Sequence, residues 1–331
     1  MLAETIVKEA ALKDPIQTEQ YVQYTLHRDK RAGTNLRDKV FGHPNSIISF
    51  REGLLAKKLG EGELKFYSFY RKQLNQVLPQ ELIPEVLGVC YITEDAKGQT
   101  SFDFTPSLKI KDKTRPPMLL QKDIAAGYVK PAILDLKIGI RTWMFGDSKE
   151  VAKRRSKKMM EGTCSVTNFR VRAAMWYSKN EKYLKYENMN SRNDNLNANV
   201  ANDINNLSEG LSIVTRNFGN KCTMDELINF FKDFMKYKTT ISAFIKKLDM
   251  LREALIKLRN NFGVRLYSSS ILIVYDEANP EKLDLRVLDF EKSYLDVEKV
   301  AEQFNESLEE CEDGIIDAVT NLMKILETIS L

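Results

Sequence analysis

Histidine is nearly absent from this chain of 331 residues, which holds only His27 and His43. Chemistry that needs a histidine base is therefore disfavoured, and carboxylates, lysines and hydroxyls are left as the reactive groups. The four cysteines lie far apart, with no Cys-x-x-Cys or Cys/His ligand spacing. That pattern argues against a zinc site and fits reduced thiols inside a cell.

A long hydrophobic run is also missing, since no stretch of about 18 apolar residues could span a bilayer. The first 15 residues mix acidic and basic groups and lack the layout of a secretory signal. Hydrophobic residues make up 43% of the chain and charged residues 29%, as in ordinary globular proteins. We expect a monomer in the cytoplasm, the nucleus or both, with no membrane partner.

Excess charge is small, with a formal net charge of +4, but basic residues gather in the run KEVAKRRSKKMMEG from position 149. On a helix, Arg154, Lys157 and Lys158 would lie three and four residues apart and could face one anionic ligand together. Lys153 and Arg155 would be turned partly aside. The alternatives are a solvated helix face and a nucleic-acid interface, but the modest net charge and the lack of interleaved aromatic residues disfavour nucleic acid as a specific partner.

One apolar segment, PAILDLKIG from Pro131 to Gly139, carries an acid and a base with a single residue between them. Side chains alternate along a strand, so Asp135 and Lys137 project to one face, while Leu134, Leu136 and Ile138 can pack on the other. The pattern fits a catalytic pair, and it equally fits an ion pair solvated at a strand end.

The region from 40 to 124 predicts a small antiparallel sheet with one helix. Apolar segments between 41 and 59 predict strand, turn and strand, and a helical spacing of apolar residues follows from position 61. Three further strands are expected in EVLGVCYI, TSFDF and PMLLQKDI.

The rest of the chain predicts further strands and several helices. After the basic helix comes a strand in NFRVRAAMWY, and two long helices are expected between 224 and 262. LYSSSILIVYD and KLDLRVLDF predict a hairpin that ends in a strand-borne acid, Asp289. Residues 188–206 contain nine asparagines and few large apolar groups, which predicts a surface insertion.

The order of charged residues matches the order of parts in phosphoryl-transfer kinases. A strand lysine, Lys57, would contact nucleotide phosphates, a helix glutamate, Glu63, would orient it, and Asp289 would bind the metal. The glycine-rich GxGxxG and the HRD motif are absent, which disfavours an ordinary protein kinase. We therefore expect an α+β, two-lobed kinase-like fold: an N-terminal extension (1–39), an ATP-binding N-lobe (40–124) and a larger C-lobe (125–331).

The segment PAILDLKIG also resembles the PxxxDxKxG signature of the inositol polyphosphate kinase family at all four fixed positions. YSSSILIVYD, RVLDFEKS, LLAKKLGEGELKFY, GTCSVTNFRV and NFGNKCTMDELINFF are similar to other segments of that family. The resemblance spans roughly residues 40–330, and it implies an ATP- and Mg²⁺-dependent kinase that acts on an inositol polyphosphate.

Site residues follow from the resemblance. Lys57 and Glu63 would serve ATP as above, and the backbone of Lys122 and Ile124 would hold adenine, with Asp123 only capping the turn. Asp135 would contact ribose or the substrate hydroxyl, and Lys137 would bridge the substrate and the migrating phosphoryl group. Asp289 would bind Mg²⁺, with Ser270 as an additional ligand or positioning group.

The substrate would bind a basic segment, 140–175, with a helical insertion. Its expected contacts are Lys137, Lys153, Arg154, Lys157, Lys158 and Arg170. A short segment after the signature disfavours the calmodulin-regulated trisphosphate kinases of the family. The segments YSSSILIVYD and DLKIG most resemble the branch that converts inositol hexakisphosphate to a pyrophosphate. A multikinase acting on tris- and tetrakisphosphates is the alternative. Glu291 stands where the family usually has a small residue, and it could alter metal affinity or access. A weakly active module that binds a polyphosphate is therefore a further alternative.

Overall fold

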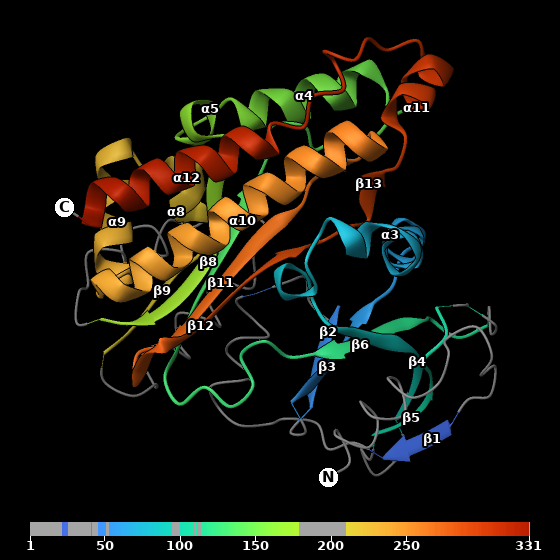
Figure 1. Ribbon diagram of the computed structural model, residues 1–331, viewed down its shortest axis with the longest axis horizontal. Coiled ribbons are helices and arrows are strands. Elements are labelled where there is room, and N and C mark those ends of the chain that lie inside the picture. The colour runs from blue at the N-terminus through green and yellow to red at the C-terminus, as the bar shows by residue number, and fades with distance from the viewer. Residues whose placement is uncertain are drawn as a thin grey trace. The chain divides into compact units, whose positions relative to one another are not determined.

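The computed structural model describes residues 22–25, 41, 46–50, 53–94, 100–108, 110, 114–178 and 210–330. The chain divides into two compact units (Figure 1). Unit 1 comprises residues 1–69 and 84–127, and unit 2 comprises residues 70–83 and 128–331. Most of the predicted extension 1–39 and the whole asparagine-rich segment 188–206 lie outside the described residues.

Unit 1 is an antiparallel sheet with the strand order β1-β5-β4-β6-β3-β2. Its strands are β1 (Val22–Thr25), β2 (Ile47–Phe50), β3 (Leu54–Lys58), β4 (Val86–Glu94), β5 (Thr100–Thr105) and β6 (Met118–Lys122). Helix α3 (Glu61–Lys72) follows β3, and acidic residues occupy its first turn, where the helix dipole favours negative charge.

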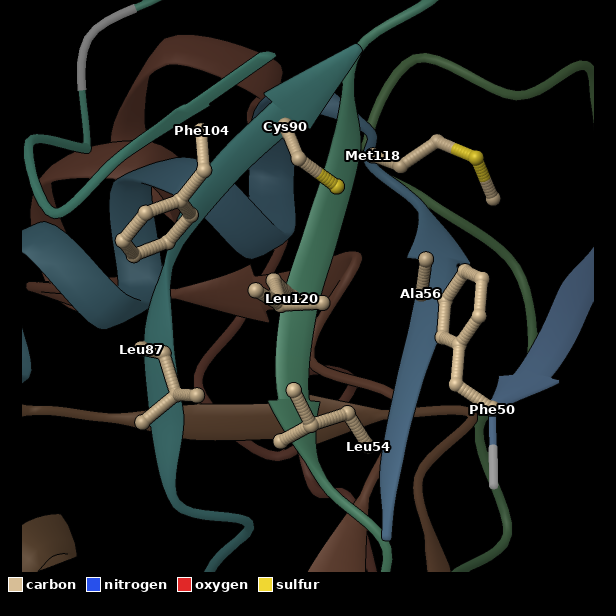
Figure 2. Packing of buried hydrophobic residues seen from close by; sticks show 8 residues of the cluster. All are labelled: Phe50, Leu54, Ala56, Leu87, Cys90, Phe104, Met118 and Leu120. Atoms are coloured by element: carbon tan, nitrogen blue, oxygen red, sulfur yellow. The ribbon is translucent and has the colours of Figure 1, made fainter. Parts of the chain in front are cut away.

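The core of unit 1 is formed by apolar side chains on one face of its strands, with Leu54 and Ala56 on β3 and Met118 and Leu120 on β6 in alternation. Figure 2 shows these side chains gathered over neighbouring strands of the sheet. They are Phe50, Leu54, Ala56, Leu87, Cys90, Phe104, Met118 and Leu120.

Unit 2 is built on a second antiparallel sheet with the order β12-β11-β7-β8-β9. Its strands are β7 (Pro131–Ile138), β8 (Phe169–Tyr177), β9 (Leu211–Val214), β11 (Ser270–Asp276) and β12 (Asn279–Leu288), and β10 (Arg265–Tyr267) pairs separately with β13 (Lys292–Tyr294). Single 3-10 turns lie at Leu74–Gln76 and Gln80–Leu82. The helices are α4 (Lys149–Met159), α5 (Cys164–Thr167), α8 (Arg216–Lys221), α9 (Met224–Phe234), α10 (Lys238–Phe262), α11 (Val297–Phe304) and α12 (Ile315–Ser330).

Long helices cover one face of this second sheet. Helix α12 contacts β7 and α10 contacts β12, and Figure 1 shows the two helices lying side by side along the sheet. On β7, Leu134, Leu136 and Ile138 are almost fully buried, as their alternation predicts. Asp135 and Lys137 therefore project from the opposite face.

The expected α+β fold with antiparallel sheets is confirmed, including the two helices between 224 and 262 and the 270–288 hairpin. One detail of the hairpin was wrong: β12 ends at Leu288, so Asp289 is not on the strand. Its backbone is left-handed, with φ +65°, which ends the extended conformation. The run LYSSSILIVYD is likewise broken, at Ser268 with φ +64°. Across the described residues, no helix has the length and apolarity to cross a bilayer.

Candidate active site

An ion pair in unit 1 joins a strand to the following helix. The Nζ atom of Lys57 on β3 lies 3.0 Å from Oε1 of Glu63 on α3. The Glu63 side chain is only 3% exposed, so its charge depends on a cationic partner. The expected ion pair is therefore present, and the contact of Lys57 with ATP phosphates stays a prediction.

The predicted adenine hinge begins at Lys122, the last residue of β6. The Lys122 N–H donates to the Glu85 carbonyl at 3.0 Å, and the Lys122 ammonium lies 2.8 Å from the Glu85 carboxylate. The Asp123 carboxylate accepts a hydrogen bond from the Ala125 N–H at 3.0 Å, so its capping of the turn is confirmed. Because the Lys122 N–H is engaged, its carbonyl oxygen and the Ile124 N–H are the groups we expect to serve adenine.

In unit 2, Asp135 and Lys137 lie on the central strand of the sheet, between β11 and β8. Asp135 is 7% exposed and Lys137 is 9% exposed. The alternative of an ion pair solvated at a strand end is therefore wrong. Burying an acid and a base costs hydration energy, and buried titratable groups with few partners mark functional sites.

Lys137 is held by a backbone carbonyl. Its ammonium donates a hydrogen bond to the carbonyl oxygen of Ser268, in the turn that precedes β11. Burial lowers the pKa of Lys137 to about 8, although the carboxylates of Asp289 and Asp135 act in the opposite direction. The amine can therefore gain or lose a proton near neutral pH.

Asp135 is paired with an arginine that the sequence analysis did not identify. One carboxylate oxygen, Oδ2, lies 3.7 Å from Nε of Arg172 on β8. The other, Oδ1, is buried and has no hydrogen-bond partner among the described residues. Burial raises the pKa of Asp135, and Asp289 adds to this rise, whereas Arg172 opposes it.

A second acid lies close to this pair. Asp289 follows β12, and its carbonyl accepts a hydrogen bond from the Ser269 hydroxyl at 3.1 Å. The negative charge of Asp289 raises the pKa of both Asp135 and Lys137, so its carboxylate lies near both. The three charged groups thus belong to one cluster in unit 2.

Beside the cluster, Ser270 is the register partner of Lys137 on β11. It is fully buried, and its hydroxyl lies close enough to the Asp135 carboxylate to lower the pKa of that acid. Mg²⁺ is commonly held by one or two carboxylates together with substrate phosphates and water. One carboxylate, Asp289, beside a buried hydroxyl fits that mode. The described ranges contain no group of three or more His, Cys, Asp or Glu side chains that could hold a metal.

The backbone at the last position of the signature requires a glycine. Gly139 has φ +86°, and a Cβ at this position would lie 2.5 Å from the Asp313 carbonyl oxygen. The same carbonyl accepts a hydrogen bond from the Ile140 N–H at 2.8 Å. A side chain at position 139 would therefore clash with the backbone that fixes the end of β7.

The predicted basic helix is confirmed as α4, and the Ser148 hydroxyl caps its first turn by accepting from the Val151 N–H. Lys153, Arg154 and Lys157 are exposed. Their binding of substrate stays a prediction, and the side chain of Lys158 lies outside the described part of the structure.

Arg155 is turned inward from this exposed face. It donates to the Thr142 carbonyl at 3.2 Å and to the Asp147 carboxylate at 2.8 Å. Lys292 donates to the same carbonyl at 2.9 Å, and its charge also lowers the pKa of Lys137. The inward side of α4 is thereby linked to the Asp135–Lys137 cluster.

Arg170 lies beside Lys137, and its binding of substrate stays a prediction. It is the register partner of Lys137 across β7 and β8, and its guanidinium donates to the Asn220 side chain at 3.2 Å. Register partners on antiparallel strands share a face, so Arg170 projects to the same side as Lys137.

Arg172 and Lys292 were missed, although one sequence signal was available. In FRVRAAMWY, Arg170 and Arg172 are two residues apart, and strand alternation places both on one face. Lys292 had no comparable signal, because it reaches the site only through the fold of β13.

A strand lysine paired with a helix glutamate, and a buried Asp/Lys pair with a second acid nearby, are typical of phosphoryl-transferring kinases. The family model "Inositol polyphosphate kinase" matches residues 118–327. The chain therefore belongs to the inositol polyphosphate kinase family.

Individual relatives are distant. Inositol hexakisphosphate kinase 3 of Mus musculus is 23% identical over 233 residues, which cover 65% of this chain and 51% of that protein. Inositol polyphosphate multikinase beta of Arabidopsis thaliana is 40% identical over 55 residues, which cover 17% of this chain and 18% of that protein. The matched part thus spans about half or less of these curated relatives.

A solved structure shares the fold. The crystal structure of the inositol phosphate multikinase Ipk2 from S. cerevisiae, in complex with ADP and Mn²⁺, matches with a TM-score of 0.56 and 17% identity. The match covers 83% of this chain and 98% of the yeast chain.

Proposed function

We propose that this protein is an ATP- and Mg²⁺-dependent kinase that transfers the γ-phosphoryl group of ATP to an inositol polyphosphate. The observation that carries the proposal is the buried pair Asp135 and Lys137 with Asp289 nearby, in a chain of this family. Phosphoryl transfer needs placement of groups and neutralisation of oxygen charge more than covalent help. A buried lysine and a metal-binding acid supply both.

Each residue has a separate task in this proposal. Lys57, oriented by Glu63, contacts the nucleotide phosphates. Asp289, with Ser270 as an additional donor, holds Mg²⁺, which neutralises phosphate charge when bound. Lys137 bridges the substrate and the migrating group. A phosphate beside this lysine favours the protonated amine over the neutral one, so the side chain would be positively charged when it contacts the phosphates.

Asp135 is suited to a substrate or ribose hydroxyl. Its Oδ1 is buried and has no hydrogen-bond partner among the described residues, so a hydroxyl donor reaching it would satisfy this oxygen. With a tris- or tetrakisphosphate, such a bond would align a substrate hydroxyl and favour loss of its proton as the new P–O bond forms. The hexakisphosphate has no hydroxyl and attacks through a phosphate oxygen, so with that substrate Asp135 would contact a ribose hydroxyl of ATP instead.

Inositol hexakisphosphate is the substrate that we favour, giving an inositol pyrophosphate. Support comes from the long match to a relative named as an inositol hexakisphosphate kinase. A multikinase acting on tris- and tetrakisphosphates is the second candidate, supported by the Arabidopsis relative and the yeast fold. The two differ in the product that they form.

The test is incubation of the full chain with radiolabelled ATP, Mg²⁺ and a panel from inositol trisphosphates to the hexakisphosphate, followed by chromatography of the products. We expect labelled product from at least one substrate and none from Lys137→Met, which keeps the side-chain volume. The surface variant Lys246→Met on α10 is the matched control. Tight binding without transfer would instead identify a polyphosphate-binding module.

A further inference from the structure

Three arginines gather at one edge of the site in unit 2. Arg170 and Arg172 lie on β8, and Arg216 is the first residue of α8, which packs against β8. Burial lowers the pKa of Arg170, and the positive charges of Arg172 and Arg216 lower it further. The positive charges of Arg172 and Arg216 therefore both act on the Arg170 guanidinium, and an anion bound beside Arg170 would offset this repulsion.

Strand alternation places Arg172 on the same face as Arg170, and a β-bulge lies at this position. Opposite β7, Leu136 pairs with Val171 and Asp135 pairs with Ala173, so Arg172 is the extra residue of β8. An extra residue bends the strand locally and redirects its side chain. Here the Arg172 guanidinium reaches within 3.7 Å of the Asp135 carboxylate, on the side that also carries Lys137.

Arg172 is not buried by this contact. Its side chain is 27% exposed and touches Asp135 through Nε, while the planar fork of a guanidinium carries four further N–H donors. Such a fork can hold a phosphate with two hydrogen bonds, which the compact ammonium of a lysine cannot do.

We propose that Arg172 is a specificity-determining residue that, together with Arg170 and Arg216, binds one phosphate group of the inositol polyphosphate other than the group next to Lys137. The inference rests on the proposed function. It predicts that substrates rich in phosphates gain more from this subsite than substrates with few, because a crowded ring always presents a phosphate to it.

The test uses the full chain with three single variants. Arg172→Gln removes the charge and keeps most of the length, and Arg172→Lys keeps the charge without the fork. Arg252→Gln is the matched control, because it makes the same change in net charge at a partly exposed arginine of α10 that is paired with Asp249. Thermal unfolding of each variant checks that the fold is intact.

Two readouts are needed. Steady-state kinetics compare inositol hexakisphosphate with an inositol trisphosphate, and calorimetry measures binding of inositol hexakisphosphate without nucleotide.

For Arg172→Gln we expect KM and Kd for the hexakisphosphate to rise about tenfold or more, because one charge-assisted phosphate contact is lost. We expect kcat to change little and the effect on the trisphosphate to be smaller. Arg172→Lys should recover part of the affinity, and Arg252→Gln should match the wild type.

Three results would overturn the proposal. Unchanged affinity in Arg172→Gln would show that no phosphate is bound there, and equal losses for both substrates would show no role in specificity. A fall in kcat at constant KM would show that Arg172 only positions Asp135. If the wild type binds the hexakisphosphate but transfers nothing, the kinase function fails while calorimetry still tests the subsite. If the wild type binds no inositol phosphate, both fail.

Discussion

Removing the Lys137 charge should stabilise the ligand-free protein while abolishing phosphoryl transfer. The lysine has an ordinary pKa of 10.5 and a pKa of about 8 in the fold, because burial disfavours its charged form. At about 1.4 kcal/mol for each pKa unit, holding the charge at neutral pH costs about 3 kcal/mol of folding free energy. Lys137→Met removes this cost, but it also loses the hydrogen bond to Ser268, about 1 kcal/mol. We expect a net gain of about 2 kcal/mol at pH 7.

The pH dependence gives the sign of the effect. Below pH 8 the lysine is charged in both the folded and the unfolded protein, so the wild type bears the full cost. Between pH 8 and 10.5 the unfolded chain binds more protons than the fold, so wild-type stability rises with pH relative to Lys137→Met. The advantage of the variant should therefore shrink across this interval.

Urea unfolding of both proteins between pH 7 and 10 measures the difference. Lys246→Met, at an exposed position of α10, is the matched control and should change stability by less than about 0.5 kcal/mol. The reasoning would be refuted if Lys137→Met were less stable than the wild type at pH 7 and the difference stayed constant up to pH 10. Such a result would show that burial does not disfavour the charged form of Lys137.

Three other perturbations follow from the same structure. Gly139→Ala should cost at least about 2 kcal/mol in urea unfolding, because φ is +86° and its Cβ would meet the Asp313 carbonyl; a neutral result would refute the close contact. Lys57→Met should lower stability by about 2 kcal/mol, since it leaves the Glu63 carboxylate buried, and should weaken ATP binding in calorimetry; unchanged nucleotide affinity would remove Lys57 from the ATP site. Arg141→Ala should lower the thermal midpoint and reduce the free energy of unfolding by about 4 kcal/mol. The reason is that this guanidinium is only 2% exposed and lies against three aromatic rings and an acid. A loss below about 1 kcal/mol would contradict that packing.

The strands and helices were predictable because their signals are local. Alternation in PAILDLKIG predicted the buried face of β7, and helical spacing predicted α9 and α10. The end of β12 was not predictable, since Asp289 is followed by a buried phenylalanine that extends the apparent β pattern. Only its left-handed backbone shows that the strand has ended.

The site was predictable in its residue types and less so in its contacts. The pair Asp135 and Lys137 was found from spacing, yet each contacts a different partner, Arg172 and the Ser268 carbonyl respectively. The Ser268 contact involves a left-handed residue before β11, and a bulge in β8 lies at Arg172. Such irregularities arise from tertiary packing and leave little trace in a period of two or 3.6 residues.

Phosphorus NMR of the complete reaction tests the central claim most directly. The full chain is incubated with ATP, Mg²⁺ and inositol hexakisphosphate, and the spectrum is followed for a new diphosphate signal on the inositol ring as ATP is converted to ADP. The account predicts that this signal grows with the wild type and is absent with Asp289→Asn and Lys137→Met. ATP turnover that yields only inorganic phosphate, or a diphosphate signal that persists in both variants, would contradict it.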